Sequence, residues 1–455
     1  MISRCGWRST RANGKLLHRQ GTRARMAIKK SPNDFQVEEI LHDDLLRLCG
    51  TGTSAGAGAS GESTAGQASS STQPYAGQAS SGTHLYALYR LKKEGLATPE
   101  AVARLARELK IAAGNVAYGG LKDKYASTLQ HISIKVEKPE SAPEQAKGSG
   151  WSIERLGFVP RSMTAADIRR NRFRITLRDV SEVACFDMDE AVRLLSNSDG
   201  QLRITNYFGD QRFGSARHGK GFIGRHLIKG DFEGALMLAI ATESRKDRMD
   251  QKVFKRTLRE HWGRWKEVLP KLKPCPERRP VERLVNSGGD FRAAFCALPY
   301  LLQQLSVYAY QSHLWNATAR TLIAEKCAEA GKIITADDPF GEMLFPEASA
   351  VPDEIKELDL PLFAKKTEAV APWKSAAETV LAEEGITMGE IFIPGVRRPF
   401  FGEEPRKLFF TTEEFHLAKA EHDETADRKN RKKRTVTFAL PPGSYATVLL
   451  RALGQ

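Results

Sequence analysis

The chain has 455 residues, 41% of them hydrophobic, and carries a formal net charge of +14 at pH 7. This length predicts about two to three domains. No apolar run approaches the roughly 18 residues of a membrane-spanning helix, which argues against a membrane protein. The six cysteines are scattered, without a CxxC pair or a close histidine, so a zinc motif and a disulfide framework are excluded and a reducing cytoplasm is favoured.

The first 27 residues are predicted to form a basic, disordered leader. Residues 1–33 hold nine Lys or Arg and no Asp or Glu, and they lack the long apolar stretch of a secretory signal. An organelle presequence and a true start at Met26 are alternatives. A cytoplasmic protein is the preferred interpretation.

The next segments alternate between ordered and low-complexity sequence. Phe35, Val37 and Ile40 follow a partly alternating pattern that predicts a first strand. Residues 51–83 are mostly Gly, Ala, Ser, Thr and Gln, and we expect a flexible insertion because they bury too little surface to offset their ordering entropy. Alternation resumes over residues 84–91, which predicts another strand.

A helix is predicted to follow this strand. Thr98 is a suitable N-cap and Pro99 a suitable first residue, and Val102, Leu105 and Leu109 form an apolar face.

One carboxylate then lies on a glycine-opened loop between two predicted strands. Gly119 and Gly120 precede Asp123, and Lys122 and Lys124 flank it. The glycines permit unusual backbone angles or close approach, and the lysines favour an ionised carboxylate and attract phosphate. An ordinary solvated turn is the alternative.

Residues Arg172–Leu177 form a further predicted strand. Asn171, directly before it, and Phe173 are two residues apart and therefore point to one face if the strand includes both. An amide beside an aromatic ring can orient a base and stack on it, although an edge asparagine beside a core phenylalanine is equally ordinary.

Residues 206–214, NYFGDQRFG, interleave aromatic, amide and basic side chains. The aromatic rings are suited to stacking on bases in a single-stranded RNA site. They are equally suited to anchoring a core at a domain junction.

Positive charge is concentrated in two segments. Residues 245–283 contain fourteen Lys or Arg against six Asp or Glu, and residues 428–434 read RKNRKKR. Such density favours a polyanionic partner, whose counterions are released on binding. Solvated helix faces are the alternative.

The pattern beyond about residue 225 is mainly helical. Leu305, Tyr308 and Leu314 predict a helix within residues 301–327. The chain ends with a predicted strand pair, 435–440 and 445–451, joined by a turn. The whole pattern predicts an α+β domain built from both chain ends, with a mostly helical domain inserted between them.

Taken together, these segments resemble the tRNA pseudouridine synthase D (TruD) family. The segments that carry the resemblance are KKSPNDFQVEEI (29–40), GGLKDKYASTLQ (119–130), NRFRITL (171–177), NYFGDQRFG (206–214), YAYQSHLWN (308–316) and FALPPGSYATVLL (438–450).

The resemblance implies an isomerase, an intramolecular transferase that converts a uridine of tRNA, most typically uridine 13, to pseudouridine. It implies neither a cofactor nor a metal. The implied partner is tRNA or another structured RNA, with no membrane and no obligate protein partner.

Residue by residue, the resemblance implies that Asp123 is the catalytic aspartate. Phe173 matches the aromatic residue that stacks on the target base, and Asn171 matches the amide beside it. Lys29 matches a basic residue of the active site, and Phe35 an aromatic residue beside the catalytic loop. Asp123 would act either as a nucleophile at C1′ or as a base at C2′.

The implied fold is α+β: a pseudouridine synthase catalytic domain with a central mixed, largely antiparallel sheet, plus an inserted, mostly helical TRUD domain. The boundaries expected for its parts are 1–27 for the leader, 28–203 for the first part of the catalytic domain, 204–398 for the insertion and 399–455 for the second part. The competing hypothesis is a non-catalytic RNA-binding or RNA-chaperone protein on the same fold.

Overall fold

The computed structural model describes residues 7–9, 16–19, 26–28, 30–50, 85–216, 218–428 and 430–455. The predicted insertion at 51–83 and the predicted site residue Lys29 therefore lie outside the described residues. The chain divides into two compact units. Unit 1 contains the described residues within Met1–Arg8, Arg19–Ile204 and Phe410–Gln455, and unit 2 those within Ser9–His18 and Thr205–Phe409. The expected insertion, 204–398, stays a prediction, and unit 2 continues eleven residues beyond its expected end.

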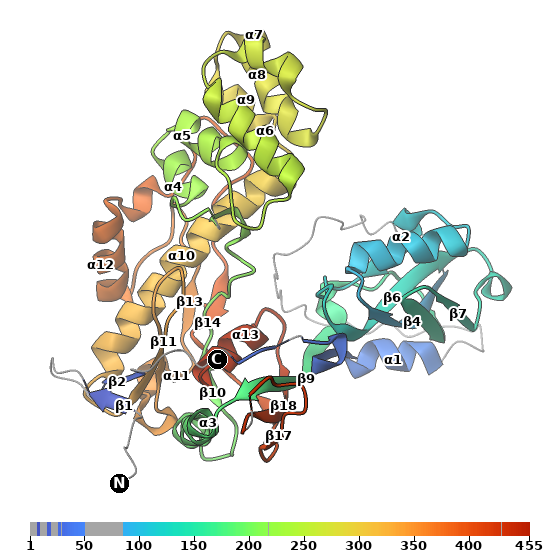
Figure 1. The fold of residues 1–455 in the computed structure, drawn as a ribbon, viewed down its shortest axis with the longest axis vertical. Coiled ribbons are helices and arrows are strands. Elements are labelled where there is room, and N and C mark those ends of the chain that lie inside the picture. Colours follow the sequence, from blue (N-terminus) through green and yellow to red (C-terminus); the bar gives the residue numbers. More distant parts are fainter. Residues whose placement is uncertain are drawn as a thin grey trace, which may run out of the picture. The chain divides into compact units, whose positions relative to one another are not determined.

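A ten-stranded sheet forms the centre of unit 1 (Figure 1). Its strands run in the order β16-β18-β9-β3-β6-β4-β8-β7, while β17 pairs with β18 and β5 pairs with β6. Only β3 and β6 are parallel among the pairs of this sheet that the structure describes. The prediction of a mixed, largely antiparallel sheet is confirmed. The strands are β3 (Phe35–Leu41), β4 (Leu85–Glu94), β5 (Val116–Tyr118), β6 (Ser127–Val136), β7 (Gln145–Gly148), β8 (Trp151–Val159), β9 (Ile168–Val180), β16 (Glu413–Leu417), β17 (Glu421–His422) and β18 (Lys432–Leu440).

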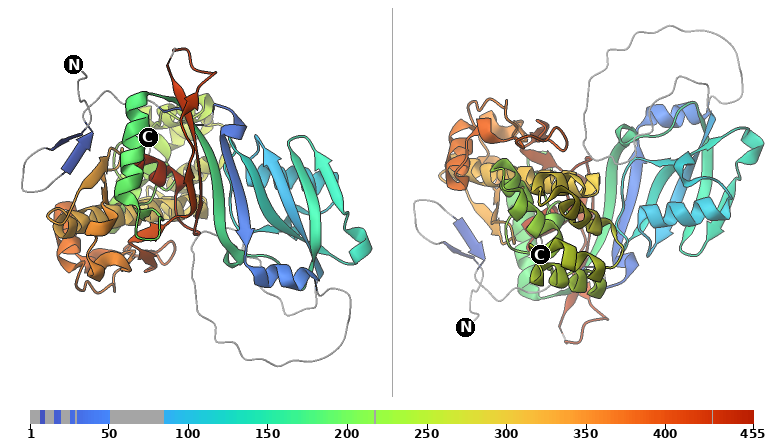
Figure 2. Two further views of the ribbon diagram at one scale, coloured as in Figure 1. Left: turned by 90° about the horizontal axis from the view of Figure 1, so that it is seen from below. Right: turned by 90° about the horizontal axis from the view of Figure 1, so that it is seen from above.

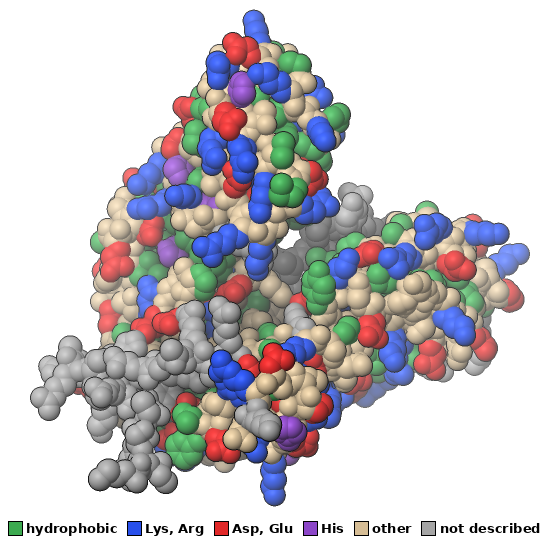
Figure 3. Space-filling model, viewed as in Figure 1, with side chains coloured by type: hydrophobic (Ala, Val, Ile, Leu, Met, Phe, Trp, Pro, Cys, Tyr) green, Lys and Arg blue, Asp and Glu red, His purple; other side chains and the backbone are tan. Residues whose placement is uncertain are grey.

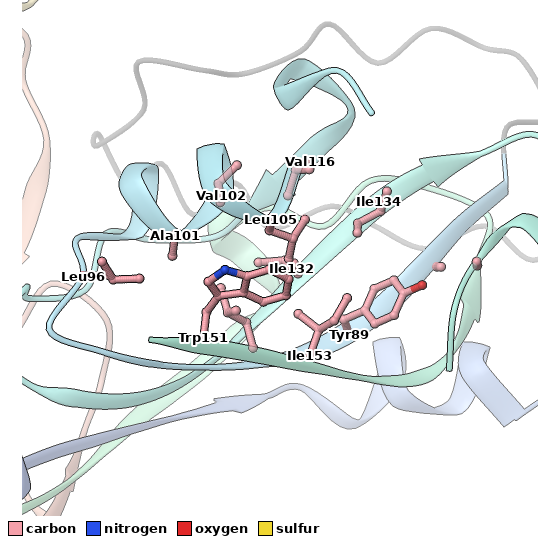
Figure 4. Packing of buried hydrophobic residues seen from close by; sticks show 13 residues of the cluster. Tyr89, Leu96, Ala101, Val102, Leu105, Val116, Ile132, Ile134, Trp151 and Ile153 are labelled. Atoms are coloured by element: carbon pink, nitrogen blue, oxygen red, sulfur yellow. The ribbon is translucent and has the colours of Figure 1, made fainter. Parts of the chain in front are cut away.

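Helix α2 (Thr98–Glu108) crosses one face of this sheet, in front of the strands in the right-hand view of Figure 2. Its Val102 and Leu105 pack on Tyr89, Ile132 and Trp151 of the sheet, as Figure 4 shows. These side chains are almost wholly buried, and each contributes about 1.5–3 kcal/mol of hydrophobic stabilisation. The alternation of β4, with odd-numbered residues toward α2, creates this core.

Helix α1 (Asp43–Gly50) covers the opposite face of the sheet (Figure 1). Its Leu45 packs with Leu88 and Val159, which belong to the other side of β4 and β8. Both faces of this part of the sheet are therefore covered by a helix.

The register of the sheet aligns side chains from five strands in one row. Phe438 pairs with Phe173, Phe173 with Val37, Val37 with Thr128, and Thr128 with Lys93. Paired residues point to the same face, so Phe173 and Lys93 share the face that α2 covers. This row carries the candidate site.

The end of the chain differs from the prediction. Strand β18 ends at Leu440 as expected, but residues 446–452 form helix α13 rather than a strand. Both sides of β18 are already paired, with β9 on one side and with β16 and β17 on the other. The apolar residues Ala446, Leu449 and Leu450 are spaced for a helix and are buried. Short apolar runs of this kind do not distinguish the two structures by period alone.

Unit 2 is mostly helical, and its long central helix α10 (Tyr300–Cys327) confirms the helix predicted over 301–327. The core face of α10 carries Tyr310, Leu314 and Trp315, all fully buried. Around it lie α4 (Ile223–Ile228), α5 (Phe232–Leu236), α6 (Met249–Glu260), α7 (Trp265–Val268), α8 (Arg279–Ser287), α9 (Phe291–Cys296), α11 (Asp353–Lys356) and α12 (Lys374–Glu384), with short strands β11 (Ile333–Ala336), β12 (Met343–Pro346), β13 (Asp359–Pro361) and β14 (Pro405–Lys407).

The remaining elements lie near the chain's N-terminus and at the crossings between the units. Within the stretch predicted to be disordered, Trp7–Ser9 and Leu16–Arg19 form strands β1 and β2, and β2 pairs in parallel with β11. Helix α3 (Glu182–Leu195) follows β9. The chain leaves unit 1 through β10 (Arg203–Thr205) and returns through β15 (Phe409–Thr411), and these two strands pair.

The basic segment of unit 2 is partly neutralised by its own carboxylates. Arg256 and Arg259 both bind Glu243, and Lys255 binds Asp247 at 2.8 Å. On the face shown in Figure 3, Lys and Arg side chains are interspersed with Asp and Glu. No described helix is long and apolar enough to cross a membrane.

Candidate active site

Asp123 lies on the loop between β5 and β6, as predicted, with its side chain half-buried. Its Oδ1 accepts a 2.9 Å hydrogen bond from the backbone N–H of Tyr125, which closes a tight turn. The Tyr125 ring is 69% exposed and the Leu121 side chain 64% exposed. The carboxylate is therefore held by its own loop, between two side chains that project into solvent.

Gly119 is required by close packing at the start of this loop. A Cβ atom there would lie 2.6 Å from Cδ1 of Ile168 and 2.8 Å from the backbone oxygen of Thr164. At Gly120 the nearest atom, Nζ of Lys122, would be 3.7 Å away. Only the first glycine is thus sterically necessary, and the loop leaves the sheet in close contact with the start of β9.

Lys122 fastens the loop to two strands of the sheet. Its Nζ lies 3.1 Å from the carboxylate of Glu39 on β3 and donates a 2.7 Å hydrogen bond to Oδ1 of Asn171 on β9. Glu39 and Asn171 are register partners. The carboxylate of Glu39 also accepts a 2.7 Å hydrogen bond from the backbone N–H of His131.

The ionised form of Glu39 is stabilised despite complete burial of its side chain. Burial favours protonation, but the hydrogen bond from His131 and the charge of Lys122 outweigh it and hold the pKa of Glu39 below its ordinary value. A buried ion pair between Glu39 and Lys122 results, and Lys122 in turn orients the amide of Asn171.

The two lysines that flank Asp123 have different roles from those that the sequence predicts. The Lys122 side chain is 9% exposed, and it is directed to Glu39 and Asn171 rather than presented to a phosphate. Lys124 binds Glu100 on α2 at 3.1 Å. Each therefore anchors the loop to a carboxylate elsewhere in unit 1.

A third lysine, which the sequence analysis did not select, holds the backbone of Asp123. Lys93 is 1% exposed, and its Nζ donates hydrogen bonds to the carbonyls of Leu96 at 2.7 Å and Asp123 at 2.9 Å. A signal was present in the sequence: alternation from Tyr89 through Leu91 places Lys93 on the buried face of β4.

Thr98 corrects another prediction. The helix begins at Thr98 itself, with Ala97 at the N-cap position and no side-chain cap. The Thr98 hydroxyl instead accepts a 2.9 Å hydrogen bond from the backbone N–H of Lys122 and donates one to Gln130. Thr98 is fully buried, and its hydroxyl joins the loop to β6 instead of capping the helix.

Three aromatic rings lie together beside this loop. Phe173 stacks on Phe438 with ring centroids 5.3 Å apart, and Phe35 meets Phe173 edge-on at 6.2 Å. Phe35 and Phe438 are buried, whereas Phe173 is partly exposed. Phe173 is therefore the ring of this cluster whose surface is available to a ligand.

The structure thus brings four of the five predicted site residues into one part of unit 1. Asn171 contacts the residue before Asp123, Phe173 follows Asn171 on the same face of β9, and Phe35 contacts Phe173. Among the described residues, no three His, Cys, Asp or Glu side chains gather as a metal-ion site.

The NYFGDQRFG segment has a structural role. Tyr207, Phe208 and Phe213 are each less than 5% exposed. Phe208 packs on Trp315 of α10, and its backbone N–H and carbonyl both bind the side chain of Asn316. Of the two interpretations, core anchoring is correct for these rings.

The comparisons with known proteins agree with this arrangement. The model of the family described as tRNA pseudouridine synthase D (TruD) matches residues 13–453. The chain belongs to the TruD family. The relation that the sequence motifs suggest is therefore confirmed over nearly the full length.

Individual relatives support the same assignment. The chain is 30% identical over 383 residues to tRNA pseudouridine synthase D of Aquifex aeolicus, covering 81% of this chain and 91% of that protein. It is 28% identical over 375 residues to probable tRNA pseudouridine synthase D 1 of Methanococcus maripaludis, covering 80% and 92%. The crystal structure of a putative TruD protein from Methanosarcina mazei covers 96% of this chain and 94% of its own, with a TM-score of 0.65 at 22% identity, and confirms the α+β fold.

Proposed function

We propose that this TruD-family protein converts uridine 13 of tRNA to pseudouridine, with Asp123 as its catalytic residue. The observation that carries the proposal is the half-buried carboxylate of Asp123, on a loop that Lys93, Thr98 and Lys122 tie to the sheet beside Phe173. A catalytic group must keep a fixed position relative to its substrate, and the hydrogen bonds of these three residues restrict the movement of the loop.

The reaction is an isomerisation that needs neither an oxidant nor a nucleotide. The N1–C1′ bond of the uridine breaks, the uracil turns, and a C5–C1′ bond forms while the proton of C5 is lost and N1 gains one. Asp123 has two possible roles, as a nucleophile that attacks C1′ or as a base that removes the C2′ proton. A substrate deuterated at C2′ separates them, because only the base mechanism gives a primary isotope effect there.

The side chains around Asp123 are suited to holding an extruded base. In this proposal the uracil leaves its stack and lies on Phe173, which offsets part of the unstacking cost by about 1–3 kcal/mol. Phe35 and Phe438 support that ring from two sides. Asn171, oriented by Lys122, borders the base, and Lys29 is the basic residue of the active site.

The inserted domain is the proposed binding site for the body of the substrate. Residues 204–398 act as the TRUD domain and bind the body of the tRNA, or of another structured RNA, without a further protein partner. The reaction takes place in the cytoplasm. A fluorescent fusion tests the location, and protection of tRNA by unit 2 in hydroxyl-radical footprinting tests the contact.

The central experiment incubates the protein with unmodified tRNA transcripts and maps pseudouridine by carbodiimide-dependent stops of reverse transcription. We expect one stop, at position 13, which disappears when uridine 13 is replaced by cytidine. Asp123→Asn should abolish product formation with little change in RNA affinity. Asp44→Asn, at an exposed aspartate of α1, is the matched control.

The competing hypothesis of a non-catalytic RNA-binding protein predicts a different outcome. Wild-type protein would bind the transcripts and leave every uridine unchanged, and Asp123→Asn would be indistinguishable from it. Product at a position other than 13 would retain the enzyme and overturn only the assigned position.

A further inference from the structure

Lys93 is an unusual residue for the middle of a sheet face. Its side chain is almost completely buried, on a strand whose neighbouring inward side chains are apolar. Burying an ammonium costs several kcal/mol unless hydrogen bonds and charges compensate for the lost water. Such a residue needs a reason beyond packing.

The hydrogen bonds of Lys93 connect the segment just after β4 with the loop between β5 and β6. One bond goes to the carbonyl of Leu96, just after β4, and the other to the carbonyl of Asp123 itself. A carbonyl held in this way fixes the peptide plane next to Cα of Asp123. The direction in which its side chain leaves the backbone is then also restricted.

We propose that Lys93 is a positioning residue for Asp123: its buried ammonium holds the backbone of the loop so that the carboxylate faces the ring of Phe173. The inference deepens the proposed function and depends on it. Lys93 itself contacts no substrate atom in this proposal. It acts through Asp123, on the face of the sheet that both Lys93 and Phe173 occupy.

The electrostatics of Lys93 add a testable property. Burial lowers the pKa of Lys93 to about 8, the carboxylate of Asp123 opposes this decrease, and the charge of Lys122 adds to it. The titratable groups acting on it are Asp123 and Lys122 from the loop, while β6 and β8 place the uncharged Thr128 and Trp151 beside it in register.

The consequence is a loop that loosens as the pH rises. A charged donor binds a carbonyl more strongly than a neutral amine, so deprotonation weakens both bonds of Lys93. The conformation of Asp123 should therefore become less restricted above about pH 8, and kcat should fall there. RNA affinity should change little over the same interval, apart from any general effect of pH on the complex.

The test compares Lys93→Met with wild type in steady-state reactions on the tRNA transcript from pH 6.5 to 9. Methionine replaces the aliphatic part of the side chain, being shorter only by the terminal nitrogen, and removes the donor and the charge. We expect kcat to fall by about 10- to 100-fold, the loss that misplacing a reactive group by about 1 Å causes, with KM changed less than about threefold. The decrease in rate above about pH 8 should be present in wild type and absent in the variant.

Hydrogen exchange separates positioning from general stability. The amide of Lys122, which donates to the hydroxyl of Thr98 on α2, and that of Tyr125, which donates to Asp123 within the loop, should exchange faster in Lys93→Met, while those of β4 and β6 keep wild-type protection. Lys92→Met is the matched control, because Lys92 is exposed on the other side of β4.

The outcomes distinguish this inference from the proposed function. If Asp123→Asn is fully active, the proposed function fails. If Asp123→Asn is inactive while Lys93→Met keeps kcat within about twofold, or keeps the wild-type pH profile, only the role of Lys93 is overturned. A loss of protection throughout the sheet of Lys93→Met would also overturn it, because the residue would then be structural.

Discussion

Lys122 donates a 2.7 Å hydrogen bond to Asn171, a residue 49 positions later in the chain. This contact joins the loop of Asp123 to β9, which carries Phe173. The loop of the proposed catalytic carboxylate and the strand of the ring proposed to hold the base are therefore linked through one lysine side chain. Because the same lysine pairs with the buried Glu39, its position is determined by charge as well as by hydrogen bonding.

Replacement of Lys122 should reveal that link. Lys122→Met leaves the carboxylate of Glu39 buried without its cationic partner, and removing one member of such a pair costs about 3–5 kcal/mol. Urea unfolding followed by circular dichroism should show a loss of this order. The double variant Lys122→Met/Glu39→Gln should recover most of the stability but not the activity, since Asn171 is still without its donor. Equal stability of the single and double variants would contradict the prediction.

The two glycines of the loop should differ in their tolerance of a methyl group. Gly119→Ala forces a contact with the backbone of Thr164, which cannot move aside easily, so we expect about 1–3 kcal/mol of destabilisation and a displaced loop. Gly120→Ala has space and serves as the control. Thermal unfolding and kcat of both variants test this. Similar results for the two would show that the loop adapts freely.

Loss of the Phe173 ring should destabilise the transition state of the reaction more than it destabilises the folded protein. Phe173→Leu removes a stacking surface that contributes about 1–3 kcal/mol per base, which corresponds to about 5- to 150-fold in kcat/KM. Phe173→Tyr keeps the ring and should keep most of the activity. A leucine variant with wild-type kcat/KM would exclude base stacking at this position.

The stability of unit 1 should depend on pH through Asp423. Burial favours protonation of this carboxylate, but the backbone N–H of Asp179, the hydroxyl and N–H of Thr425 and the guanidinium of Arg178 outweigh it and lower its pKa to about 2. A lowered carboxylate pKa stabilises the folded state at pH values above the unfolded pKa of about 3.9. This stabilisation is lost as the pH falls toward 2.

Asp423→Asn should accordingly cost about 2 kcal/mol at pH 7, measured by hydrogen exchange of β9 and β18 amides under urea. The difference from wild type should shrink between about pH 4 and pH 2. Asp427→Asn, at an exposed position of the same hairpin, is the control. A difference that stays constant down to pH 2 would show that the cost is steric and not electrostatic.

Much of the site could be predicted from the sequence because its motifs are local. The positions of Asp123 between two strands and of Asn171 and Phe173 on one face follow from alternation over a few residues. The family relation rests on motifs that are contiguous in the chain, and the comparisons confirm it. Short-range periodicity can be recognised from the order of residues alone.

The tertiary structure decided what each side chain binds. From the sequence, Lys122 and Lys124 are predicted to favour the ionised form of Asp123 and to attract phosphate. In the structure, each pairs with a carboxylate on another element. Tyr207 read equally well as a base-stacking ring and as a core residue, and it is buried. The sequence analysis predicted no role for Lys93, although its side chain holds the backbone of Asp123. These outcomes depend on contacts between residues distant in sequence, and burial and partner geometry arise only when the strands are in register.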